Sequence, residues 1–101
     1  MSHSERVVHI DTSEVRVTEW RLGSGASTSR RRLNCDFVVV PLTDGRICFK
    51  RTDGENVVEI TTGACVLRAA PSEVEASNSG TDRIAFVEIE LKDSVRRLIS
   101  G

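Results

Sequence analysis

Residues 37–45 read FVVVPLTDG, a strongly β-prone run closed by a proline and a glycine turn. Aromatic and β-branched side chains at 37–40 favour a strand. Pro41 has no N–H to donate to a neighbouring strand, so we expect this strand to end at a sheet edge or a turn. Residues 43–45 supply the turn before the next strand begins.

Similar short runs extend on both sides of this segment. We predict further strands at residues 7–10, 14–22, 46–50, 57–60, 65–67 and 84–91, because apolar and polar positions alternate there and turn residues separate the runs. Within residues 14–22 the apolar positions change parity after Val17, which predicts a bulge or bend near Glu19. Residues 94–99 fit either a short helical turn or an extended segment.

The regular spacing of these runs is typical of an all-β sandwich or barrel. We expect about eight to ten short strands. The chain has 101 residues, which fits one domain. We place its core at about residues 15–92, an N-terminal arm or strand at 1–13 and a C-terminal extension at 93–101.

The composition restricts the partners and the compartment. The chain has 14 basic and 15 acidic residues and a net charge of −1, so it lacks the basic excess that nucleic-acid binding needs. No apolar run approaches the roughly 20 residues that span a bilayer, and the polar N-terminus does not resemble a secretory signal. We expect no nucleic-acid or membrane partner.

The three cysteines point to a reducing compartment. Cys35, Cys48 and Cys65 are odd in number and widely spaced, which disfavours a disulfide framework and favours the cytoplasm. We interpret all three as small apolar side chains in strands. Arginines next to Cys35 could lower its pKa, but no histidine base lies near it in the sequence.

Five segments, taken in order, resemble the small cupins. They are WRLGSG at 20–25, FVVVPLTDG at 37–45, TGAC at 62–65, NSG at 78–80 and FVEIELK at 86–92. The resemblance covers about residues 15–92. It implies a cupin-type double-stranded β-helix barrel, which is jelly-roll-like and is often paired into homodimers.

The positions that hold a metal in the resembled family carry other residues here. The two histidines of the first cupin motif fall at Arg31 and Leu33, and the histidine of the second motif falls at Val74. The carboxylate falls near residues 36–38, where only Asp36 has suitable chemistry. Arginine stays protonated and has no lone pair to give a metal. We therefore expect no metal and no other cofactor.

By the same resemblance, Arg31 lies inside the barrel. A buried guanidinium needs a partner, because an unpaired buried charge is costly. The partner could be an internal carboxylate, such as Asp36, Glu73 or Glu75, or it could be an anionic ligand held by two hydrogen bonds. The candidate ligand-binding residues are Arg31, Leu33, Asp36, Val74, Trp20 and Phe49, of which the two aromatic residues also fit the core.

The remaining titratable side chains fit surface positions. Glu88 and Glu90 share one parity of the last predicted strand, opposite its apolar residues, which we interpret as the solvated face of a half-buried strand. His3 and His9 are the two histidines, and we interpret both as exposed or structural. The alternative is an N-terminal arm that delivers His9 into the barrel.

These features favour a metal-free cupin-like barrel that binds a small molecule, with an anion as one candidate, or that serves as an interaction module. We identify no catalytic residue. The alternative is a metal-dependent isomerase, lyase or dioxygenase of the cupin type, with His9, Asp36 and a cysteine as unusual ligands. A third is a relic subunit that pairs with a competent partner.

We expect a homodimer formed through an exposed strand edge.

Overall fold

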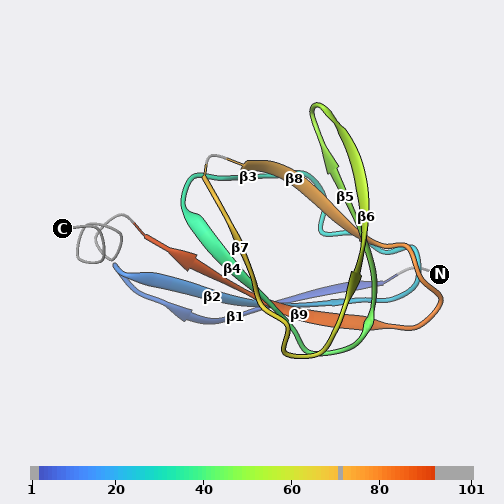
Figure 1. Cartoon of the computed structure of the whole chain (residues 1–101). Helices are drawn as coiled ribbons and strands as arrows, with labels where there is room; N and C mark the ends of the chain where they lie inside the picture. The colour runs from blue at the N-terminus through green and yellow to red at the C-terminus, as the bar shows by residue number, and fades with distance from the viewer. Residues whose placement is uncertain (1–2, 71, 93–101) are drawn as a thin grey trace.

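The computed structural model describes residues 3–70 and 72–92, and the strands in this part form two antiparallel sheets that face each other (Figure 1). The five-stranded sheet has the order β1-β2-β9-β4-β7, and the four-stranded sheet has the order β3-β8-β5-β6. The strands are β1 (Ser4–Asp11), β2 (Val15–Leu22), β3 (Arg31–Leu33), β4 (Asp36–Pro41), β5 (Gly45–Arg51), β6 (Gly54–Ile60), β7 (Val66–Arg68), β8 (Ser72–Asn78) and β9 (Ile84–Leu91). The predicted all-β barrel class is confirmed.

Two of these strands, β3 and β8, are not among the predicted ones. Both lie in stretches rich in polar and charged residues. In β8, Val74 and Ala76 face the core with exposed fractions of 3% and 1%, while Glu73 and Glu75 alternate with them. Only two small or medium apolar side chains mark this strand, so its alternation is weak in the sequence.

The bulge predicted near Glu19 is wrong. The strand β2 pairs with β9 in unbroken register along its whole length, and the register shift lies instead on β1, between Val8 and Ile10. The parity change in the sequence has another cause. Thr18 is buried and shares the inner face with Trp20, whereas the valines of this strand lie on the other parity.

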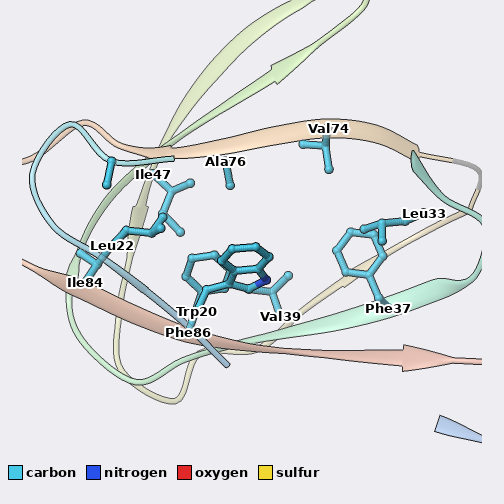
Figure 2. Close-up of a cluster of buried hydrophobic side chains, with 11 residues drawn as sticks. Trp20, Leu22, Leu33, Phe37, Val39, Ile47, Val74, Ala76, Ile84 and Phe86 are labelled. Atoms are coloured by element: carbon cyan, nitrogen blue, oxygen red, sulfur yellow. The ribbon is translucent and has the colours of Figure 1, made fainter. Parts of the chain in front are cut away.

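One apolar core lies between the sheets (Figure 2). Its buried members are Trp20, Leu22, Ala26, Leu33, Phe37, Val39, Ile47, Val74, Ala76, Ile84 and Phe86. The sheets approach closely at Gly45, where a Cβ atom would lie 2.4 Å from Cγ2 of Ile84. A glycine is therefore required there, because any side chain would displace a fully buried core residue.

The prediction for residues 94–99 concerns a segment that lies outside the described residues. Within the described ranges, no helix is long and apolar enough to cross a membrane.

Candidate functional site

The pairing of β3 with β8 brings together the positions where the family resemblance expects metal ligands. Arg31 lies directly opposite Val74, and Leu33 follows two residues later on the same parity of β3. Leu33 and Val74 are buried in the core. Figure 2 shows Val74 directed from β8 into the space between the sheets, and Leu33 beside Phe37. The three positions therefore lie close together, but two of them, Leu33 and Val74, have apolar side chains that cannot bind a metal ion.

Arg31 is paired inside the barrel with Glu88 of β9. Its Nη1 donates to Glu88 Oε1 at 2.5 Å, and its Nη2 donates to Glu88 Oε2 at 3.0 Å. Trp20 Nε1 donates to the same Glu88 Oε1 at 3.1 Å, and the Arg31 guanidinium lies 5.0 Å from the centroid of the Trp20 ring. A two-point arginine–carboxylate pair with an aromatic neighbour is strong and geometrically fixed.

This pair corrects two predictions. The carboxylate partner of Arg31 is Glu88, not one of the three expected acids. Glu88 also does not lie on a solvated face, since its exposed fraction is 4%. On β9 the inner parity runs through Ile84, Phe86 and Glu88, so the acidic residue continues the core face. The apolar residues between them face outward, and their hydrophobicity suggested the opposite orientation.

One atom of the pair has no hydrogen-bond partner. In the described part of the chain, Arg31 Nε is buried without an acceptor. A buried N–H of a charged group costs free energy when it is left unbonded. The two terminal nitrogens nevertheless neutralise Glu88, so the Arg31 charge is already matched.

The other predicted site residues lie elsewhere. Asp36 is on the parity of β4 opposite to the buried Phe37, and its Oδ1 accepts the backbone N–H of Ala70 at 2.7 Å. His9 lies on β1, where its Nε2 is 2.8 Å from Glu19 Oε1. The structure does not bring His9 and Asp36 together. The binding roles predicted for the site residues stay predictions.

The cysteines are present as thiols in three different environments. Cys35 is half-buried, Cys48 is buried and Cys65 is exposed. Burial, reinforced by the neighbouring Glu55 carboxylate, raises the pKa of the Cys48 thiol. A thiol held in its protonated form is a poor nucleophile and a poor metal ligand.

The residues at the barrel centre do not fit a metal ion. A cupin metal needs imidazole and carboxylate donors that converge on one point, whereas Arg31, Leu33 and Val74 offer no lone pair there. Across residues 3–70 and 72–92, no group of three or more His, Cys, Asp or Glu side chains could hold a metal ion. The chemistry of these three side chains therefore argues against a metal ion at this centre.

A cavity of about 170 Å³ opens elsewhere in the barrel, between the edge strands β6 and β7. Its wall is mostly apolar and comprises Val39, Pro41, Phe49, Val58, Glu59, Ile60, Thr61, Ala64, Cys65, Val66 and Arg68. Phe49 was predicted as a site residue and lies in this wall. Arg68 was not predicted. The sequence offered one signal for it, which is that Arg68 shares its strand parity with Val66. In the structure these two residues lie opposite the buried Phe37 and Val39, respectively, and face inward.

The two facing antiparallel sheets, with the first-motif segment β3 beside the second-motif segment β8, define a double-stranded β-helix. The chain belongs to the cupin superfamily. It is 40% identical over 85 residues to the β-alanine degradation protein BauB of Pseudomonas aeruginosa, a match that covers 84% of this chain and 90% of that protein. A comparison with models of known protein families gives no match.

Solved structures agree with this assignment. A cupin domain from Bordetella pertussis Tohama I is 35% identical, with a TM-score of 0.83 over 88% of this chain and 93% of that one. An RmlC-like cupin from Methanocaldococcus jannaschii has a TM-score of 0.73 over 94% of this chain and 86% of that one. Its 15% identity supports the fold alone.

Proposed function

We propose that this cupin barrel binds a small organic molecule without the help of a metal ion. The observation that carries the proposal is the Arg31–Glu88 pair, which lies where the family's metal site would be. A two-point ion pair and buried hydrocarbon replace the metal donors, while an apolar cavity remains open between β6 and β7. Ligand sites are usually such mostly apolar concave surfaces with a few polar groups.

The relative supports a small acid as the ligand. BauB is named for the degradation of β-alanine, a small amino acid with a carboxylate group. A carboxylate is also what an arginine in a pocket wall recognises best. The ligand class that we propose is therefore a small organic anion, and the three thiols fit a protein that works in the reducing cytoplasm.

Elemental analysis and ligand screening test this function together. Protein purified without added metal should contain far less than one transition-metal ion per chain, and its thermal unfolding temperature should rise with at least one member of a panel of small organic acids. A content of one transition-metal ion per chain would overturn the proposal. So would the absence of any thermal response across the panel.

We also propose that two copies of the chain pair through the outer face of the five-stranded sheet, rather than through the exposed strand edge expected from the sequence. On this face Val38 lies opposite both Ile89 and Leu67, and Val40 lies opposite Val87. Leu67 is 65% exposed, and the others are partly buried. A connected apolar patch of this kind marks an interaction site, and a net charge of −1 opposes self-association little.

A further inference from the structure

We propose that the cavity between β6 and β7 binds a monocarboxylic acid with a short apolar tail, and that Arg68 holds its head group. This inference rests on the proposed function and names the site and the ligand class. It has three supports, which are the cavity wall, the environment of Arg68 and the cleft that joins it.

The cavity wall fits an apolar tail. Val39, Pro41, Val58, Ile60 and Val66 are among the apolar residues that line it. The volume of about 170 Å³ is close to that of engineered cavities of about 150 Å³ that admit benzene. A tail of about six non-hydrogen atoms is therefore the size that fills it.

Arg68 is placed to receive an anion. Its guanidinium lies 5.2 Å from the centroid of the Phe49 ring, and its pairing opposite Phe37 puts it on the inner parity of β7. Among the described residues, no Asp or Glu oxygen lies within 4.0 Å of Arg68, whereas Arg31 has Glu88. The Phe49 ring that Arg68 faces carries no charge, so it does not neutralise the guanidinium.

The surroundings of Arg68 favour a bound counter-ion. Burial lowers the pKa of Arg68, and the like charge of Arg51 lowers it further. A partly buried cation beside a second cation is stabilised when an anion arrives. The ligand's carboxylate would relieve both effects, and the planar guanidinium can bind both of its oxygens.

A second cleft connects this cation to the solvent along the β5–β6 hairpin, which extends away from the rest of the barrel (Figure 1). Phe49 and Arg68 line both cavities, and Arg51, Asp53 and Glu55 also line the cleft. The two acidic residues disfavour a second negative group on the ligand. A monocarboxylate is therefore favoured over a dicarboxylate.

Calorimetric titration of the full chain with hexanoate tests the proposal. We expect saturable binding of hexanoate, with weaker binding of glutarate and of the uncharged hexan-1-ol. Arg68→Gln should weaken hexanoate binding about 10–100-fold, and Arg68→Lys should recover part of the loss. The matched control is Arg32→Gln, an exposed arginine on β3 outside both cavities, which should leave the affinity within about twofold.

A second pair of variants tests the tail site. Val58→Phe fills the cavity and should abolish hexanoate binding, whereas Val57→Phe changes the neighbouring exposed residue outside the wall and should not. Folding of each variant is checked by its thermal unfolding. Equal losses in both variants, or full affinity in folded Val58→Phe, would overturn the proposal.

Amide chemical-shift mapping separates this inference from the function on which it rests. Shifts caused by hexanoate at β6, β7 and Phe49 support the site. Shifts from any small acid that centre on Arg31 and Glu88 would overturn the Arg68 site and keep the proposed function. No response to any acid in the panel would overturn both.

Discussion

Arg31 and Glu88 lie 57 positions apart in the chain and form a two-point ion pair between the two sheets, with N–O distances of 2.5 and 3.0 Å. Arg31 belongs to β3 in one sheet and Glu88 to β9 in the other. The side chains carry opposite charges, and Glu88 also accepts the Trp20 indole N–H. The centre of this cupin is therefore an internal polar contact, beside the positions where the family resemblance implies metal ligands.

Glu88→Gln should destabilise the fold. It removes the charge that compensates Arg31, whose side chain is only 19% exposed. We expect a loss of about 2–4 kcal/mol in the free energy of unfolding, measured by urea denaturation. The control Glu59→Gln removes one member of an exposed ion pair, since Arg46 lies 3.6 Å away and the two side chains are 61% and 79% exposed, and it should cost less than about 1 kcal/mol.

Replacing both members of the pair by methionine should restore part of the lost stability. Two apolar side chains of similar length remove both buried charges at once, so no uncompensated ion remains. The Trp20 indole N–H loses its acceptor in this variant, so we expect Arg31→Met with Glu88→Met to be more stable than Glu88→Gln but still about 1–3 kcal/mol less stable than the parent protein. A double variant no more stable than Glu88→Gln would show that the pair contributes more than mutual neutralisation.

Three histidine substitutions should create a metal site in the barrel. Arg31→His, Leu33→His and Val74→His place imidazoles at positions that share the inner face of β3 and β8, near Glu88. We expect Co²⁺ or Zn²⁺ binding with a Kd of about 1 μM or tighter, read from the visible spectrum of bound Co²⁺ and a rise in thermal stability. The control variant uses Arg32→His, on the outward parity, in place of Arg31→His. Equal Co²⁺ binding by both triple variants would contradict the inward direction of residue 31.

Ile89→Lys should convert the proposed dimer into monomers. Ile89 lies at the centre of the apolar outer face, opposite Val38 and Val17, and a buried ammonium there would be unpaired. Light scattering after size-exclusion chromatography reports the mass directly. Val57→Lys, an exposed change on β6, should leave the dimer intact, and a monomeric parent protein would exclude this interface.

The contact between Asp44 and Thr62 should make stability depend on pH. The Asp44 carboxylate accepts the Thr62 backbone N–H at 2.8 Å and its hydroxyl at 3.0 Å, and both bonds lower the pKa of Asp44 below its usual 3.8. A carboxyl group whose pKa is lower in the folded state stabilises the fold above the unfolded-state pKa. That stabilisation is lost as the pH falls through the folded-state value.

Asp44→Ala measures this dependence against the parent protein. The difference in unfolding free energy should be constant from about pH 6 to 8 and should shrink as the pH falls below about 4. Thr62→Val, which removes only the hydroxyl bond, should show a smaller difference over the same range. A difference that stays unchanged at low pH would mean that the Asp44 charge is not its cause.

The sequence alone was sufficient for the fold class because strand alternation and turn residues are local signals. The run at 37–40 and the turn at 43–45 fall where the structure has β4 and the start of β5. The order of the glycine turns supported the cupin family, and the aligned positions of Arg31, Leu33 and Val74 already showed that the usual donors are missing.

Only the tertiary structure shows which charged side chains form ion pairs. Strand parity shows which residues share a face, but not whether that face is inward, and the outward aliphatic residues of β9 made Glu88 look solvated. Sheet order then placed Glu88 beside Arg31, and left Arg68 of the short edge strand β7 in the wall of an apolar cavity. These contacts depend on residues far apart in the chain, and only the closed barrel brings them within bonding distance.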